Sequence, residues 1–307
     1  ASVKSDYYSG LAQYLAGQRT AAFASFYKVF VLRAGTEFDD KILLVLQARN
    51  DSIKDFMSDA AWLKRAQNLR VVGQTDEAVK ILERLSQKNR AAYLSEFAEA
   101  LFDNRDYTEA AEQFEQLLRT TQAIHKRIDI LSKLSQAYAR SNNFDQAIKA
   151  NITLLTDFPK SKEALQVPFK IASLTFDAGR YDEAINKFEP FLVDKDKHRQ
   201  ILAFNYRAWS NYLLGRYREA ITEWENLKKL TTDDGRRTTA LYWQARASEK
   251  TGDKKAADIF YRLAAEADSN EYYGLLAKQR MTFGKLEPQT LVRTSWMEIK
   301  PNASFDA

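Results

Sequence analysis

A short phrase recurs along this chain, and its spacing limits the folds that the chain can adopt. It reads Ala-Gly-Arg-Tyr-Asp-Glu-Ala at 178–184, Leu-Gly-Arg-Tyr-Arg-Glu-Ala at 214–220 and, more divergently, Thr-Gly-Asp-Lys-Lys-Ala-Ala at 251–257. Glycine commonly ends one helix, and a short polar stretch commonly begins the next. The phrase therefore indicates the turn of a helical hairpin, and the chain is read as successive copies of that hairpin.

The final alanine of the phrase allows the copies to be counted. It occurs in seven copies, and from the third copy onward the steps are 37, 37, 36 and 37 residues. The step before these is 32 residues, and the first step is 56. The residue twelve positions before each alanine is always small, which lets two antiparallel helices approach closely where they cross. The alanines are Ala22, Ala78, Ala110, Ala147, Ala184, Ala220 and Ala257, and the small residues are Gly10, Ala66, Ala98, Ser135, Ala172, Ala208 and Ala245.

A third position supports the same interpretation. Four residues after the alanine, on the same helix face, six of the seven copies carry a bulky side chain, and Asn151 is the exception. This pattern resembles the tetratricopeptide family, whose period of about 34 residues is slightly shorter. The resemblance implies hairpins stacked into a superhelical solenoid, a U or a ring. The bulky residues are Phe26, Leu82, Phe114, Phe188, Trp224 and Tyr261.

We therefore predict an all-α chain of helix–turn–helix repeats. Residues 1–284 form the α-superhelical repeat domain, with an irregular part at about 35–58, and residues 285–307 form an extended tail or linker towards an absent domain. The irregular part contains a helix over 36–49 and a short helix over 51–57. A last helix over 270–283 has Ser269 as its N-cap. The predicted hairpins span 5–33, 59–88, 91–120, 125–157, 162–193, 199–230 and 237–267.

Composition narrows the class of protein. The chain has no cysteine, which excludes disulfides, zinc–thiolate sites and cysteine nucleophiles and suits the bacterial periplasm. It has no apolar run of about 18 residues, so no membrane span is expected. Because it begins at Ala1, we interpret it as a processed or trimmed product, either exported or cut for study.

Few residues suggest chemistry. His125 and His198 are the only histidines and fall in different repeats, so neither a metal site nor a cofactor is expected. No phosphate-binding loop or nucleophile elbow occurs. The acidic pairs at 39–40, 182–183 and 233–234 lie at helix starts or turns, where capping and solvation explain them. The residues alone favour a binding or scaffolding solenoid, with first-helix residues lining its concave face.

The net charge of +5 permits a modest basic surface. Arg236, Arg237, Lys278 and Arg280 are its candidate residues in the C-terminal third. They could face an anionic polymer, or they could belong to an ordinary solvated helical exterior. No nucleic-acid-binding signature accompanies them, so no nucleic-acid partner is expected.

The segment from Leu241 to Arg280 carries a more specific resemblance. It reads Leu-Tyr-Trp-Gln-Ala-Arg-Ala at 241–247, then a glycine and Ala-Ala-Asp-Ile-Phe-Tyr-Arg-Leu-Ala at 256–264, then Glu-Tyr-Tyr-Gly-Leu-Leu-Ala at 271–277. This order resembles the end of the superhelical domain of soluble lytic transglycosylases. In that family a lysozyme-like catalytic domain follows, and it cleaves peptidoglycan glycan strands to 1,6-anhydro products.

The same resemblance has a limit. The Glu-Ser, Gly-Leu-Met-Gln and Asn-Ala-Gly motifs of the family are absent, so no catalytic residue is assigned. By resemblance, Tyr272, Tyr273 and Leu275 are candidate contacts with the absent catalytic domain.

Two functions follow as expectations. The first is a non-catalytic scaffold domain of a periplasmic peptidoglycan lytic transglycosylase, whose partners are glycan strands and a C-terminal catalytic domain. The second is a non-enzymatic repeat adaptor that binds a protein or peptide partner in envelope assembly. The absence of any catalytic constellation in seven hairpins favours the second, and the segment from Leu241 to Arg280 favours the first.

Overall fold

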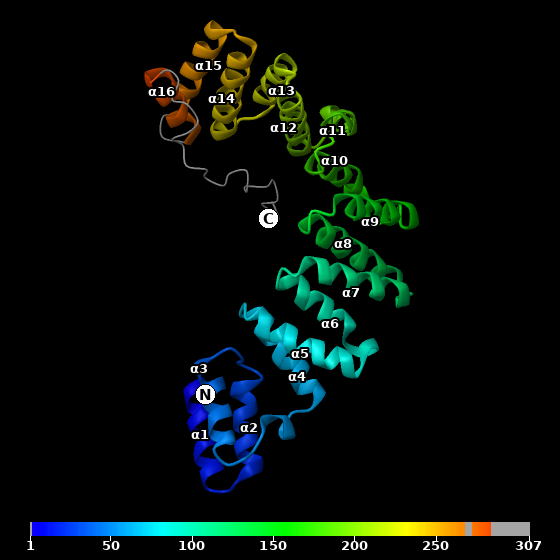
Figure 1. Cartoon of the computed structure of the whole chain (residues 1–307), viewed down its shortest axis with the longest axis vertical. Helices are drawn as coiled ribbons and strands as arrows, with labels where there is room; N and C mark the ends of the chain where they lie inside the picture. Colours follow the sequence, from blue (N-terminus) through cyan, green and yellow to red (C-terminus); the bar gives the residue numbers. More distant parts are fainter. Residues whose placement is uncertain (1, 268–271, 284–307) are drawn as a thin grey trace. The chain divides into compact units, whose positions relative to one another are not determined.

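The structure is a computed structural model that describes residues 2–267 and 272–283. Within these residues every regular element is a helix (Figure 1). The elements are α1 (Val3–Leu15), α2 (Arg19–Phe30), α3 (Glu37–Gln47), η1 (Ile53–Phe56), α4 (Asp59–Val71), α5 (Thr75–Lys88), α6 (Arg90–Asp103), α7 (Tyr107–Thr120), α8 (Ile124–Arg140), α9 (Phe144–Asp157), η2 (Ala164–Gln166), α10 (Val167–Asp177), α11 (Tyr181–Phe188), η3 (Glu189–Val193), α12 (Lys197–Leu213), α13 (Tyr217–Leu230), α14 (Asp234–Thr251), α15 (Lys254–Ala267) and α16 (Tyr272–Phe283).

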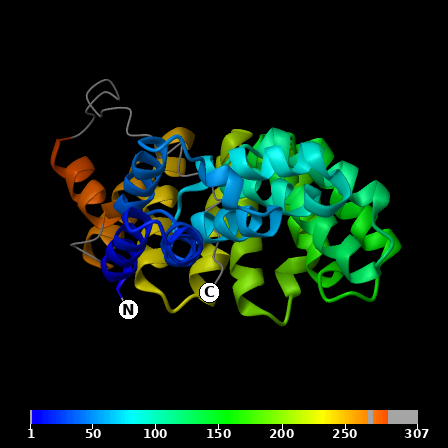
Figure 2. The ribbon, with the colours of Figure 1, turned by 90° about the horizontal axis from the view of Figure 1, so that it is seen from below.

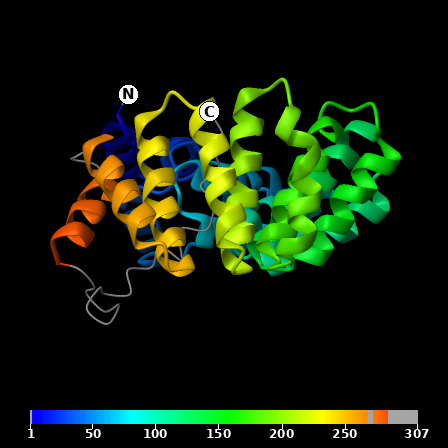
Figure 3. The same ribbon diagram turned by 90° about the horizontal axis from the view of Figure 1, so that it is seen from above.

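The chain forms two compact units, Ala1–Lys170 and Ile171–Ala307. In the first unit, the second helix of each regular hairpin contacts the first helix of the next, so that α4 to α9 follow one another (Figure 2). The second unit repeats this arrangement from α12 to α16 (Figure 3). Each unit therefore buries its core between neighbouring hairpins, as expected of a repeat array.

The predicted hairpins and the helix over 36–49 are confirmed, with local differences around two prolines in the hairpin over 162–193. The short helix predicted over 51–57 is the 3₁₀ helix η1, and the described part of the last helix is α16. In the hairpin predicted over 162–193, the first helix starts only at α10, and Pro168 lies in its first turn, where a missing N–H costs little. The second helix, α11, gives way at Glu189 to the 3₁₀ turn η3, which contains Pro190. The predicted N-cap Ser269 and the predicted tail 285–307 lie outside the described residues.

Close helix crossing holds each hairpin together. All seven repeat alanines are buried, and so are the seven small residues twelve positions earlier. Gly10 shows how little space remains, because a Cβ atom added there would lie 2.7 Å from the Phe26 ring. The backbones approach until no larger side chain fits between them.

In the hairpin α8–α9, two polar residues occupy the helix crossing. The position that is bulky elsewhere carries the buried Asn151, and the opposite small position carries the buried Ser135. The Asn151 amide donates hydrogen bonds to the Ser135 hydroxyl and to the Ala147 carbonyl. Because a buried amide needs partners, Asn151, the exception at the bulky position, is matched by Ser135, whose hydroxyl distinguishes it from the other small residues.

One backbone conformation closes every hairpin. Five turns place glycine at the same position with φ between 75° and 81°, as Gly179 and Gly215 do. The other two turns place Arg105 (φ 68°) and Asn142 (φ 60°) there. The left-handed conformation is therefore set by the hairpin geometry, and the residue has to accept it.

The irregular region before α4 is fastened by a buried arginine. Arg65 of α4 is 2% exposed, and its guanidinium reaches the Phe30 carbonyl, Asp39 of α3 at 2.7 Å and Glu77 of α5 at 2.6 Å. Asp39 also accepts a hydrogen bond from the Gly35 N–H. Asp39 therefore joins α3 to the array, in addition to standing in the first turn of its helix.

The Ser135–Asn151 pair gives a prediction about stability. Ser135→Ala alone should lower the free energy of unfolding by about 1–2 kcal/mol, because the Asn151 amide loses a buried acceptor. Adding Asn151→Leu should recover most of this loss, since the crossing then matches the other hairpins. Urea unfolding of the wild type, both single variants and the double variant measures the coupling. Strictly additive effects would contradict the pairing.

Candidate functional site

Three neighbouring first helices of the first unit are joined by polar side chains. Gln67 of α4 donates a hydrogen bond to Glu96 of α6 at 3.1 Å. Arg70 of α4 contacts Glu96 and Glu99 at 3.2 Å each and Asp103 at 2.7 Å. Lys133 of α8 forms an ion pair with Glu99. We call these six residues, Gln67, Arg70, Glu96, Glu99, Asp103 and Lys133, the first-helix surface.

The repeat register explains why these residues meet. Gln67 and Glu99 each directly follow the small crossing residue of their helix. Glu96 and Lys133 each stand two positions before it. Because neighbouring hairpins repeat the same geometry, equal positions in the repeat lie on the same side of successive first helices.

The surface has a partly buried cation beneath exposed anions. The Arg70 side chain is 16% exposed, whereas Glu96, Glu99 and Asp103 are 33%, 34% and 42% exposed. Partial burial acts to lower the pKa of Arg70, but Asp103 and Glu99 outweigh it and raise the pKa. Partial burial likewise acts to raise the pKa of Glu99, but Lys133 and Arg70 outweigh it and lower the pKa. The arrangement holds carboxylates in fixed positions at the surface, which suits binding.

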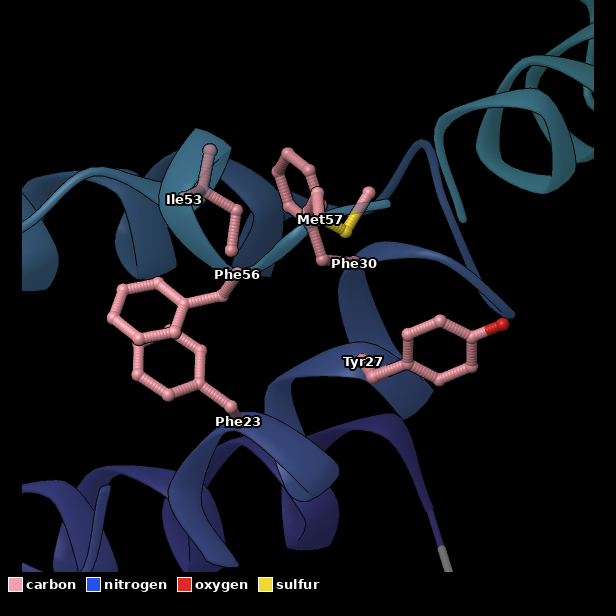
Figure 4. A pocket seen from close by; sticks show the side chains of 6 residues that line it. All are labelled: Phe23, Tyr27, Phe30, Ile53, Phe56 and Met57. Atoms are coloured by element: carbon pink, nitrogen blue, oxygen red, sulfur yellow. The ribbon is translucent and has the colours of Figure 1, made fainter. Parts of the chain in front are cut away.

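A small apolar hollow lies between α2 and η1, with a volume of about 50 Å³. Figure 4 shows Phe23 of α2 and Phe56 of η1 stacked on one side of it, at a ring-centre distance of 3.4 Å. Phe30, Ile53 and Met57 line it with Tyr27. The hollow has room for no more than a small group and carries no charged lining residue. We therefore interpret the hollow as a packing gap beside the irregular region and not as a ligand site.

The aromatic residues of the second unit form a packed cluster. The ring centres of Trp209 and Trp243 are 4.5 Å apart, and those of Tyr242 and Tyr273 of α16 are 5.2 Å apart. Trp224, Tyr242 and Trp243 are buried. The tryptophans of α12, α13 and α14 therefore join helices to one another, and the rings of the buried Trp224 and Trp243 are not available for stacking on a ligand.

The candidate contacts on α16 differ in exposure. Tyr272 and Leu275 are exposed, whereas Tyr273 is half-buried within the aromatic cluster. The exposed pair remains a predicted contact with a following domain, and Tyr273 contributes to packing within the unit.

The candidate basic residues lie on two helices of the second unit. Arg236 and Arg237 are in the first turn of α14, and Lys278 and Arg280 are near the end of α16. Arg237 and Lys278 are exposed, and Arg236 and Arg280 are half-buried. A shared basic surface stays a prediction.

The described residues offer little for catalysis. No group of three or more histidine, cysteine, aspartate or glutamate side chains that could hold a metal ion occurs among them. His125 and His198 are both exposed. Asp233 caps α14 by accepting the Arg236 N–H at 2.7 Å, and Asp182 pairs with Arg216 at 2.7 Å. With Asp39, which binds Arg65, each of the three acidic pairs has a structural partner. None of the helices within residues 2–267 and 272–283 has the length and apolar character needed to cross a membrane.

Sequence reasoning did not single out the first-helix surface. The available signal was the register, because residues at equal distances from the crossing alanine share a side of the array. Applied to α4, α6 and α8, this rule would have brought Gln67, Glu99 and Gln136 together and directed attention to the charges beside them.

Family models described as tetratricopeptide repeat match residues 63–123, 169–228 and 238–271, just over half of the chain. The unmatched stretch between the first two segments contains α8 and α9, the hairpin with the Ser135–Asn151 pair. No curated protein sequence matches the chain.

One solved structure supports the same fold, with a TM-score above 0.5. The C-terminal part of a tetratricopeptide-repeat-containing protein from Cytophaga hutchinsonii is 17% identical, covers 77% of this chain and 92% of its own, and gives a TM-score of 0.53. A tetratricopeptide repeat protein from Parabacteroides merdae is 14% identical, covers 91% of this chain and 98% of its own, and gives a TM-score of 0.45. At 17% identity, the likeness to the Cytophaga hutchinsonii structure concerns the fold alone.

The lowered pKa of Glu99 predicts a pH dependence of stability. A carboxyl group whose pKa is lower in the folded state stabilises the fold above its unfolded pKa, which is about 4.5 for a glutamate, and loses this contribution as the pH falls through the folded pKa. Between pH 6 and pH 3, Glu99→Gln should therefore lose less stability than the wild type, by about 0.5–1 kcal/mol for a partly exposed pair.

Thermal unfolding at each pH measures this difference. Glu83→Gln, at an exposed site on α5, is the matched control and should follow the wild type. Equal pH profiles for Glu99→Gln and the wild type would contradict the assigned role of the Lys133 and Arg70 contacts.

Proposed function

Since the chain belongs to the tetratricopeptide-repeat family, we propose that it is a non-enzymatic adaptor that binds a segment of another protein on its first helices. The observation that carries the proposal is the first-helix surface, where α4, α6 and α8 present fixed polar groups side by side. A surface that is already ordered loses little conformational entropy on binding.

The chemistry of the surface fits binding better than catalysis. Its charged groups are held by one another, as Arg70 is by three carboxylates. None of the six residues is a hydroxyl or thiol nucleophile beside a base, which acyl transfer or hydrolysis through a covalent intermediate would need. Hydrogen bonds from a partner's amide and amine groups to the half-exposed carboxylates of Glu96 and Glu99 supply specificity instead.

A displayed random-peptide library selected against the full chain tests this function. Selected peptides should bind with measurable affinity in calorimetry, and Glu96→Gln with Glu99→Gln should weaken binding at least tenfold. Glu83→Gln makes the same chemical change on the second helix α5 of the same unit and should leave the affinity unchanged.

Two results would overturn the proposal. One is the absence of any peptide that binds. The other is equal weakening by the first-helix pair and by Glu83→Gln. Thermal unfolding of each variant separates a loss of binding from a loss of fold.

A second function is favoured by one observation, the resemblance of Leu241–Arg280 to the superhelical domain of lytic transglycosylases. In this proposal the chain is the scaffold part of a periplasmic enzyme and positions peptidoglycan strands for a following lysozyme-like domain. Tyr272 and Leu275, both exposed on α16, are then the contact with that domain.

Purified cell-wall sacculi test the second function. The chain should co-sediment with sacculi, and the protein from which it derives should release 1,6-anhydro products from them. A protein that is exported to the periplasm but does neither is not a lytic transglycosylase. Recovery of the protein outside the periplasm would contradict this function on its own.

A further inference from the structure

The second helices of the repeats share an outward-facing stripe. The residue two positions after the repeat alanine is exposed in all seven copies, and the residue six positions after it is exposed or half-buried. In the first six copies neither position carries a bulky apolar side chain. The residues are Ala24, Lys80, Glu112, Lys149, Asn186 and Thr222 at the first position, and Lys28, Arg84, Gln116, Thr153, Pro190 and Asn226 at the second.

The seventh copy departs from this rule. On α15 the two positions carry Ile259 and Leu263, which are 50% and 42% exposed. Lys255 lies one turn before them and Glu266 one turn after them, and both are exposed. Spacings of four, four and three residues put all four side chains on one helix face. We call Lys255, Ile259, Leu263 and Glu266 the α15 stripe.

The end of the repeat array does not account for this apolar pair. The same two positions stay open to solvent on α5, α7 and α13, each of which is followed by another helix of its unit. A further hairpin would therefore leave Ile259 and Leu263 uncovered as well. Packing between repeats therefore does not explain why two bulky apolar side chains stand at these positions.

The charges of the stripe also run against helix stability. The helix dipole favours acidic residues in the first turn and basic residues in the last turn. On α5 the first turn holds Asp76 and Glu77 and the last turn holds Lys88. On α15 the first turn holds no acidic residue and the last turn no basic one, and Lys255 and Glu266 stand at the opposite ends. Within the described residues, neither of them forms an ion pair with another side chain. Helices α6, α10 and α12 also lack an acidic first turn and a basic last turn, so the order of the charges matters here because it makes the stripe basic at one end and acidic at the other.

We propose that the α15 stripe binds the α15 stripe of a second copy of this chain, with the two helices antiparallel. A two-fold axis beside Tyr261 brings Ile259 of one copy opposite Leu263 of the other. The same axis brings Lys255 opposite Glu266 at both ends. Because a two-fold interface must be self-complementary, a stripe that is basic at one end, apolar in the middle and acidic at the other end fits a second copy.

We expect a weak association, because the interface is small. One helix from each copy buries much less than the 1,200–2,000 Å² of stable interfaces. We expect a dissociation constant of roughly 10 µM to 1 mM, which places the dimer among transient assemblies. The proposal stands independently of the peptide-binding function, because α15 belongs to the second unit and faces outward.

Sedimentation equilibrium of the full chain from about 1 to 500 µM tests the proposal. The wild type should show a monomer–dimer equilibrium. Ile259→Thr with Leu263→Asn, the residues that α13 carries at the same positions, should weaken dimerisation at least tenfold. Lys149→Thr with Thr153→Asn on α9 changes the same positions of another repeat and should have no effect.

A charge exchange separates a second copy from any other occupant. Lys255→Glu alone and Glu266→Lys alone should each weaken the dimer, because like charges then face each other. The two changes together should restore it, since the exchanged stripe is again self-complementary.

Three results would overturn the proposal. A wild type that stays monomeric over the whole range would mean that the pair serves a different partner. A dimer that survives Ile259→Thr with Leu263→Asn would place the interface elsewhere. A double charge exchange no better than the single changes would exclude the antiparallel arrangement.

Discussion

The close crossing of two helices at a pair of small residues is the constraint on which this structure depends. Ala208 and Ala220 are both fully buried, and nothing larger than a methyl group separates the backbones at such a point. This contact fixes the hairpin, and the hairpin fixes the position of each following side chain. The same crossing recurs seven times, so one local rule sets the register of the whole array.

The position of a residue within the repeat also decides on which surface its side chain lies. The distance of a residue from the crossing alanine along the sequence decides where it lies. Residues at the same distance take the same place in each copy, whether in the core, on the first helix or on the outer side of the second helix. Departures from the rule then identify special places. Asn151 departs together with Ser135, and its buried amide is hydrogen-bonded. Ile259 and Leu263 depart on the outer side of α15, where both side chains are exposed.

The sequence predicted the helices and the core well because the repeat supplies seven copies of the same evidence. It was less informative about the candidate site. Arg70 reaches Glu96, Glu99 and Asp103 across a helix pair, from residues 26 to 33 positions away, and no local pattern marks such a contact. From sequence alone, a tryptophan in a helical repeat fits either packing between helices or stacking on a ligand. Only the burial of Trp224 and Trp243 decided for packing.

The sequence by itself determined the all-helical fold, the positions of the hairpin turns and the residues of each crossing, because these follow from short-range periodicity and from side-chain size. The tertiary structure decided which polar residues meet. It joined Arg65 to Asp39 across the irregular region and set Arg70 among three carboxylates. Such pairs depend on how one hairpin is placed against the next. That placement is a property of the folded stack and is not encoded in any single repeat.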